Sequence, residues 1–457
     1  MKAFRPSARL FLSLISLLLA LPLVPTPASA QSHVLTLADA VRLALRKSPV
    51  LQAASSGLDA ARGREGQAMS GWLPTVVGVA SYNRQTGNYT PRPGATPTTV
   101  TSGTLSNSNT SYDVFNFGLS LQQTVWDFGR TLGQHRRARA GVDAARSDLA
   151  DVRLAVAGLV VQQYYAVLAT EDLVGVALRT AEQAERSAAQ AKAMFEAGTR
   201  PRIDVARTEA DSQGAKAGVL AAHDARAVAL ESLLASIGDP TIVDVAVIAP
   251  SDDPARTVVP EDLEGAVREA LSRRPDRAAL DARIQAQEAA VGALTGNYWP
   301  ILSANASVTD AGVELDNLAW NWGVGALVTV PILSAVNSSF QVQEAKAVLA
   351  QLRSQRDALD MGTRAEVRQT VARLSDALAR LTPLGAQVVA ATEARDLARG
   401  RYEAGAGNSV ELLDAQSALA NAEAGLVRAR FDLAVARVGL EVALGRMPLG
   451  IGAEEAR

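Results

Sequence analysis

The side chains of this chain that could do chemistry are two carboxylates, Glu411 and Asp414. They lie three residues apart in a strongly helical segment, so they share one face of a helix. Close carboxylates attract cations and raise one another's pKa, provided that the fold gathers them. The plain alternative is acidic charge near a helix N-terminus, which the helix dipole stabilises.

Other reactive groups are scattered along the chain. His33, His135 and His223 are isolated and show no metal-ligand or catalytic-triad spacing. The sequence has no cysteine and no Gly-x-x-x-x-Gly-Lys phosphate-binding motif. We therefore predict that the protein is not an enzyme, with no catalytic residues, no metal and no cofactor, and that any energy for its function comes from a partner.

The first thirty residues predict an exported protein. Three basic residues precede an apolar run from Leu10 to Val24, and Ala28-Ser29-Ala30 offers a small-residue cleavage site before Gln31. Removing residues 1–30 takes away three positive charges, so the net charge goes from −2 to −5. This charge does not suggest a nucleic-acid partner. No later stretch reads as a transmembrane helix from composition alone.

An internal duplication organises the rest. Residues 195–238 align without a gap onto residues 402–445, 207 positions later. Earlier segments of the first half also match segments of the second half, at a separation of 226 positions before the first strand and of 205 positions after it. The difference, 226 − 205 = 21, predicts an enlarged polar loop around residues 83–112 in the first copy. We expect a first repeat over 31–250 and a second over 251–457.

Four segments alternate apolar and polar residues as membrane β-strands do. They lie near residues 71–82, 115–126, 299–308 and 320–333. All five tryptophans lie in or beside them, as expected for rings at a membrane interface. The alternative is a soluble β-hairpin core.

Long helices are predicted for most of the remaining chain. Residues 131–197 contain no proline and would span roughly 100 Å. Residues 336–404 repeat this pattern except for Pro383, where we expect a break or kink. The last helix has coiled-coil spacing, with leucine every seven residues at Leu412, Leu419, Leu426, Leu433 and Leu440.

Taken in order, these features resemble the TolC family of outer-membrane efflux proteins. The resemblance rests on Trp72-Leu73-Pro74 at a strand entry, Val125-Trp126-Asp127-Phe128-Gly129 at a strand exit, and Tyr402-x-x-Gly405 followed by Val410-Glu411-Leu412-Leu413-Asp414-Ala415. It covers nearly the whole chain after residue 30. The second strand exit departs from the pattern, because it reads Val330-Pro331-Ile332-Leu333 where relatives often have a glycine pair.

The resemblance implies a mostly α fold with membrane β-strands: a long coiled-coil helical barrel, and four strands per chain that close a twelve-strand barrel in a homotrimer. Four strands cannot close alone, and open sheet edges are not tolerated in lipid. It also implies a passive exit duct in the cell outer membrane, embedded in lipid, with its helical tube in the periplasm. The expected partners are a periplasmic adaptor protein and an inner-membrane transporter, in an efflux or type I secretion system.

The resemblance assigns four residues to the periplasmic entrance of this tube. Glu411 and Asp414 would line the closed entrance, where threefold symmetry would gather three copies of the pair into a ring. Asp204 and Tyr402 match positions that form bonds between entrance helices in relatives. The basic residue that often lies two places after the second tip glycine is replaced here by Gly407, so the resemblance does not carry that bond over.

Two glycine turns would form the periplasmic tips that touch the adaptor. These are Gly198-Thr199 and Gly405-Ala406, where long helices must reverse. Glycine also ends helices by adopting left-handed backbone angles, whether or not the turn is an interface. A structural coiled-coil surface protein or adhesin is the alternative function, although it does not account for the strands.

Overall fold

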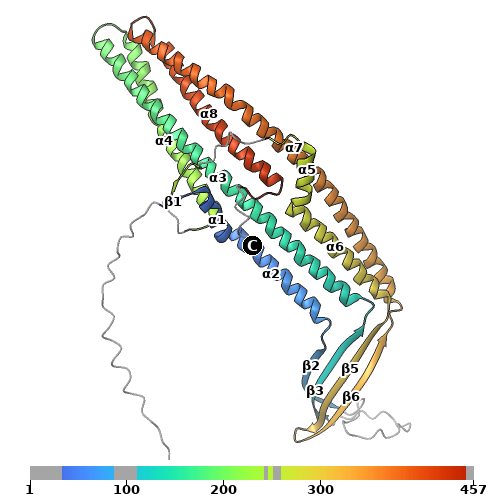
Figure 1. Cartoon of the computed structure of the whole chain (residues 1–457). Coiled ribbons are helices and arrows are strands. Elements are labelled where there is room, and N and C mark those ends of the chain that lie inside the picture. Colours follow the sequence, from blue (N-terminus) through green and yellow to red (C-terminus); the bar gives the residue numbers. More distant parts are fainter. Residues whose placement is uncertain (1–32, 87–110, 241–244, 251–258, 449–457) are drawn as a thin grey trace, which may run out of the picture.

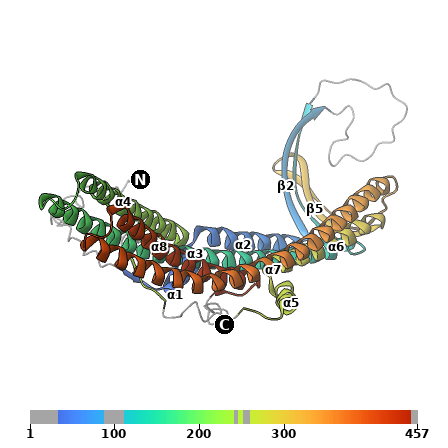
Figure 2. The same cartoon turned by 90° about the horizontal axis from the view of Figure 1, so that it is seen from above.

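The computed structural model describes residues 33–86, 111–240, 245–250 and 259–448 (Figure 1). The predicted signal sequence and most of the predicted polar loop lie outside the described residues. Two long helical hairpins run away from a sheet, so that the sheet lies at one end of the molecule and the hairpin turns lie at the other (Figures 1 and 2).

Each half of the chain begins with a helix pair that is divided at a proline. Proline is well suited to start a helix, and it pushes the preceding residue out of the helical region. Ser48 and Arg274, which precede the two prolines, accordingly have ψ values of 123° and 125°. The pairs are α1 (Leu37–Lys47) with α2 (Pro49–Ser70), and α5 (Leu263–Arg273) with α6 (Pro275–Thr295).

The two predicted long helices are present. Helix α3 (Arg130–Glu196) has 67 residues and α7 (Ser334–Glu403) has 70. Helix α4 (Arg202–Ile237) returns along α3, and α8 (Ser409–Ala443) returns along α7. The predicted leucine seam of α8 is largely buried, since Leu412, Leu419, Leu433 and Leu440 are each at most 9% exposed.

A break or kink was expected at Pro383; the break was wrong, because α7 continues through this residue, and the kink stays a prediction. Proline removes one N–H and so leaves the carbonyl four residues earlier without its helical partner. Both Pro383 and Ala379 are exposed, so water can satisfy that carbonyl.

One stretch of α3 is more apolar than expected from composition. An 18-residue window reaches a mean hydropathy of 1.4, and α3 is long enough to cross a membrane by length and composition. However, Val160, Val161 and Val167 in α3 are fully buried and pack with α1 and the end of α4 in one core cluster. We interpret this stretch as the core of the helical region.

The sheet contains β2 (Thr75–Thr86), β3 (Ser111–Trp126), β5 (Ile301–Glu314) and β6 (Asn317–Thr329), in that order and antiparallel throughout. A separate parallel pair joins β1 (His33–Leu35) to β4 (Val245–Val247). The helices that continue from the sheet follow the same spatial order, because α2 packs on α3, α3 on α6 and α6 on α7. Strands β2 and β6 are therefore the edges, and each has one unpaired side.

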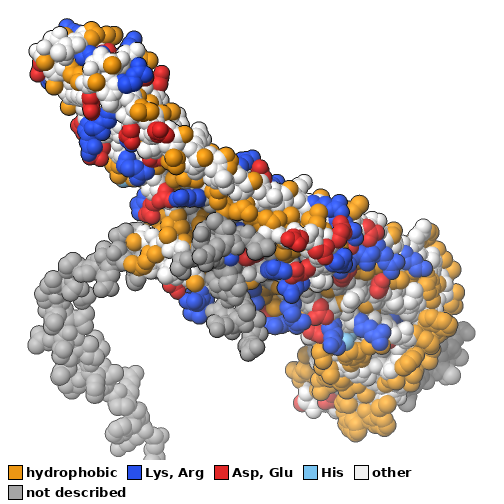
Figure 3. Space-filling view, turned by 45° about the horizontal axis from the view of Figure 1, so that its top comes forward, with side chains coloured by type: hydrophobic (Ala, Val, Ile, Leu, Met, Phe, Trp, Pro, Cys, Tyr) orange, Lys and Arg blue, Asp and Glu red, His pale blue; other side chains and the backbone are white. Residues whose placement is uncertain are grey.

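The register of the sheet separates an apolar face from a polar one. Directly paired residues project to the same face of a sheet. Leu119, Val308 and Trp322 form one such row, and the next row on the opposite face is Ser120, Ser307 and Gly323. The apolar face is exposed, with Trp322 at 68% and Leu119 at 60%. Hydrophobic side chains cover the strand end in Figure 3.

Candidate functional site

The two hairpin turns have the same backbone geometry. Gly198 and Gly405 have φ values of 74° and 78°, which side chains disfavour. At each turn the next residue closes the helix: Thr199 N donates to Met194 O at 3.0 Å, and Ala406 N donates to Arg401 O at 2.9 Å. This is the Schellman arrangement that ends α-helices. All four predicted tip residues are exposed.

Asp204 and Tyr402, predicted to bond across the entrance, are both buried just behind these turns. Asp204 is 6% exposed and Tyr402 is fully buried. The carboxylate of Asp204 accepts a hydrogen bond of 2.7 Å from the hydroxyl of Ser409, which belongs to the other hairpin. Asp204 thus bonds across the hairpins to Ser409 and not to Tyr402.

Arg200 supplies the positive charge that the sequence lacks at Gly407. It lies two residues after Gly198, as Gly407 lies two residues after Gly405, and it reaches across to the second hairpin. Its guanidinium donates to the carbonyl oxygens of Gly407 at 2.8 Å and Tyr402 at 3.1 Å. It also lies 4.7 Å from the centre of the Tyr402 ring, which is cation–π geometry.

Burial raises the pKa of the Tyr402 hydroxyl above its ordinary value, and the nearby Asp204 charge adds to this rise. The hydroxyl oxygen has no hydrogen-bond partner among the described residues. Tyr402 therefore stays neutral at physiological pH and acts here through its ring, which packs with Ala398, Leu412 and Met194.

Glu411 and Asp414 lie in the first two turns of α8 but have different surroundings. Asn408 caps the helix by accepting from Glu411 N at 2.8 Å. The Glu411 carboxylate pairs with Arg401 at 2.8 Å, whereas the exposed Asp414 makes no ion pair with any described residue. Of the two carboxylates, only Asp414 is left without a compensating positive charge.

Sequence reasoning missed the roles of Ser409 and Arg200. Ser409 adjoins the Val410 to Ala415 motif, and its only signal was its position at the start of α8. Arg200 lies just after the other tip, and no spacing rule joins it to Tyr402 and Gly407, which are 202 and 207 positions away. Both become partners only when the two hairpins lie side by side.

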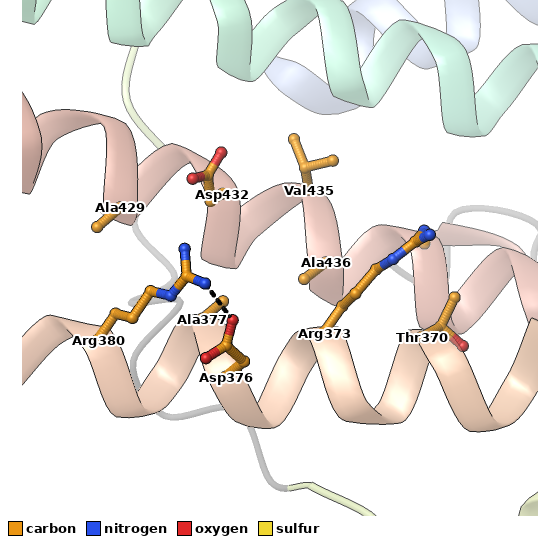
Figure 4. A pocket seen from close by; sticks show the side chains of 10 residues that line it. Thr370, Arg373, Asp376, Ala377, Arg380, Ala429, Asp432, Val435 and Ala436 are labelled. Atoms are coloured by element: carbon orange, nitrogen blue, oxygen red, sulfur yellow. Dashed lines mark ion pairs between the residues drawn. The ribbon is translucent and has the colours of Figure 1, made fainter.

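A groove between α7 and α8 lies elsewhere, with a volume of about 320 Å³ (Figure 4). Arg380 and Asp376 lie one turn apart on α7 and form an ion pair of 2.6 Å. Asp432 lines the groove from α8. The remaining lining includes small or apolar residues such as Ala377, Ala429 and Val435. We interpret this groove as a solvated helix-packing surface.

Comparison with known proteins identifies the family. The family model described as "outer membrane efflux protein" matches residues 40–239 and 266–446. The chain belongs to this family. It is an outer-membrane efflux channel component with a periplasmic helical tube, and the alternative of a coiled-coil adhesin is not supported.

Individual relatives agree with this assignment. The pyoverdine export outer membrane protein OpmQ of Pseudomonas aeruginosa is 27% identical over 355 residues, which cover 75% of this chain and 73% of OpmQ. The solvent efflux pump outer membrane protein SrpC of Pseudomonas putida is 27% identical over 388 residues, or 82% of this chain and 77% of SrpC. The outer-membrane channel OprN shares the fold, with a TM-score of 0.77, 23% identity, and coverage of 90% and 89% of the two chains.

Proposed function

We propose that three copies of this chain form one passive exit duct, with a membrane barrel of 3 × 4 strands that continues into the helical tube. The sheet carries this proposal. It has an apolar exposed face, a polar opposite face and two unpaired edges at β2 and β6. Lipid does not tolerate an open edge, so β6 of one copy must pair with β2 of the next.

We infer that an inner-membrane transporter delivers substrates to this duct through a periplasmic adaptor. The exposed turns at Gly198-Thr199 and Gly405-Ala406 are the proposed contacts for the adaptor, because they lie farthest from the sheet (Figure 1). Behind them, Asp204, Tyr402 and Arg200 hold the two hairpins together, and Asp414 faces solvent without a paired charge. Three copies of Asp414 and Glu411 would give the entrance its acidic ring.

Cysteine crosslinking tests the assembly, since the chain has no cysteine of its own. In a series of double variants, one cysteine always replaces Ser81 on β2, and the second replaces one residue of β6, at successive positions from Asn321 to Thr329. Oxidation should give a covalent ladder that ends at three chains. Ser120 on the central strand β3 is the control position and should give no ladder. A ladder that stops at two chains, or crosslinks only within one chain, would contradict the trimer.

Transport is tested by deletion. Cells that lack the protein should accumulate a fluorescent dye that is normally exported, and plasmid-borne protein should restore export. Normal accumulation of all dyes and normal secretion in the deletion strain would count against a duct.

A further inference from the structure

Beside the sheet, an aromatic cluster marks where its apolar face ends. Trp126 pairs with Leu302 and, through it, with Val328 on the apolar face. Phe128 contacts Trp126 edge-on at 6.0 Å and stacks on Trp299 at 5.2 Å. The three rings are between 43% and 59% exposed. Exposed aromatic rings at this position are typical of the boundary between lipid tails and headgroups.

A groove of about 600 Å³ between α3 and α6 begins at this cluster. Phe128 and Leu132 line its end nearest the sheet, and Arg136 and Arg139 line it farther along α3. Because Phe128 both lines the groove and contacts Trp126, the groove opens on the apolar side of the sheet. Figure 3 shows Lys and Arg side chains where the hydrophobic strand surface meets the helices.

The two arginines are exposed and have no partner among the described residues. Neither guanidinium forms a hydrogen bond or ion pair with any described residue. The two carboxylates of the groove are already neutralised, because Asp143 pairs with Arg146 at 2.8 Å and Glu288 pairs with Arg353 at 2.7 Å. The groove therefore offers two uncompensated positive charges to an anion.

The helix places these charges at the depth of lipid headgroups. Arg136 and Arg139 follow the first residue of α3 by about 9 and 14 Å along the helix axis. Side chains lean toward the N-terminus of their helix, which for α3 is the membrane end, and arginine extends its charge on a long apolar stem. The headgroup layer on one side of a bilayer is about 5–8 Å thick. Arg136 reaches into this layer, and Arg139 reaches its border.

We propose that Arg136 and Arg139 bind the phosphate of an anionic glycerophospholipid in the periplasmic leaflet of the outer membrane, and that the Phe128–Trp299 stack packs against its apolar part. The guanidiniums hold the phosphate oxygens, and the acyl chains lie along Trp126 and Leu302. This rests on the proposed assembly in the membrane. The groove stays open in that assembly, because α3 and α6 are the central helices of each chain and the edges are α2 and α7.

The test uses the purified full-length mature protein in detergent, with phosphatidylglycerol titrated in and bound lipid counted by native mass spectrometry. The site variant is Arg136→Gln/Arg139→Gln. The control is Arg137→Gln/Arg153→Gln, which removes the same charge from exposed positions on the same helix. Arg137 lies away from the groove, and Arg153 follows Arg130 by about 35 Å.

We expect the site variant to bind phosphatidylglycerol about 10- to 30-fold more weakly, which corresponds to two arginine contacts with an anionic lipid. The control variant should bind it as the unchanged protein does, and phosphatidylethanolamine, whose ammonium offsets its phosphate charge, should lose less affinity in the site variant than phosphatidylglycerol does. Millimolar inorganic phosphate should not displace the lipid, since the acyl chains contribute to binding; displacement would show a free-anion site and overturn the lipid assignment.

Equal binding by the site variant and the unchanged protein would overturn the proposal, as would an equal loss in the control. Insertion and conductance in phosphatidylethanolamine bilayers are measured in parallel on the unchanged protein. Failure there would refute the duct itself, whereas normal conductance with unchanged lipid binding in the site variant would refute only this site.

Discussion

Arg200 is the most informative residue to remove, because it joins the two hairpins at the proposed entrance. Arg200→Ala deletes two hydrogen bonds to carbonyl oxygens, of 2.8 and 3.1 Å, and the contact with the Tyr402 ring at 4.7 Å. Hydrogen bonds to charged groups contribute about 1.5–3 kcal/mol, and an exposed cation–π contact adds about 0.5–1 kcal/mol. Arg200 is half-buried, so solvent weakens both contributions. We take about 2 kcal/mol as the combined free energy of the hydrogen bonds and the cation–π contact.

If separating the two hairpins of one copy breaks these contacts, their loss favours the separated state of that copy by about 30-fold. A hairpin pair that is separated about 1% of the time would then be separated about a fifth of the time, and opening of the trimer increases accordingly. Single-channel recording in planar lipid bilayers measures this directly. Arg200→Lys keeps the charge but loses the planar fork of donors, so its open probability should lie between those of the unchanged protein and the alanine variant.

The matched control is Arg202→Ala, which removes a positive charge from the same tip. Arg202 is exposed and makes no hydrogen bond or ion pair with any described residue. Its loss should leave the open probability within twofold. The reasoning would be refuted by an unchanged open probability in Arg200→Ala, or by the same increase in both variants.

Three further predictions concern stability and motion. The Tyr164 hydroxyl lies 2.6 Å from the carbonyl oxygen of Ile248 and 2.9 Å from that of Leu35, and its single proton is shared between these two acceptors, so Tyr164→Phe should cost about 1–3 kcal/mol and lower the thermal unfolding midpoint. Burial raises its pKa to about 12, so the unfolded state ionises first and stability should fall between pH 10 and 12; the fall should be smaller in the variant, where the pKa of Tyr402 is still raised, and an equal fall would contradict this assignment. A Cβ at Gly133 would lie 2.8 Å from the Cβ of Ala293, so Gly133→Leu should cost about 1–3 kcal/mol in thermal denaturation, unlike Gly141→Leu, which meets open space. Spin labels at Thr199 and Ala406 should report different displacements of the two hairpins on opening, because the contacts at the two turns differ; equal displacements would refute this.

The features with a regular period were predictable from the sequence. Coiled-coil spacing predicted α3, α7 and the buried leucines of α8, because helices that pack side by side need apolar residues at this spacing. Alternation predicted the four strands for the same reason, although β3 begins at Ser111, earlier than expected. Pro383 was misjudged because the cost of a lost helical bond depends on access to water, which only the folded chain shows.

The candidate site was less predictable because its contacts join distant positions. Asp204 and Tyr402 came from resemblance alone, and the structure adds Ser409 and Arg200 as the residues in contact with them. A compensating charge on the opposite hairpin has no local sequence signal. The glycine pair, by contrast, was visible in the sequence, since glycine is the residue that adopts a left-handed turn most readily.

Two kinds of packing in the part of the helical tube near the hairpin turns suggest how the proposed entrance can open without unfolding. Within the second hairpin, α8 buries its leucine seam, which is non-directional packing that deforms at high cost. Between the hairpins, toward the tips, the contacts include several directional polar pairs: a neutral pair contributes about 0.5–1.5 kcal/mol net, and a pair with a charged member about 1.5–3 kcal/mol, less where solvent screens it. If the adaptor offers equivalent donors and acceptors, its hydrogen bonds can replace those between the hairpins one pair at a time. The hairpins would then separate as intact units, and opening would need far less energy than melting either of them. The pairs are Arg179 with Glu423, Gln183 with Arg395, Ser187 with Gln416, and Asp204 with Ser409.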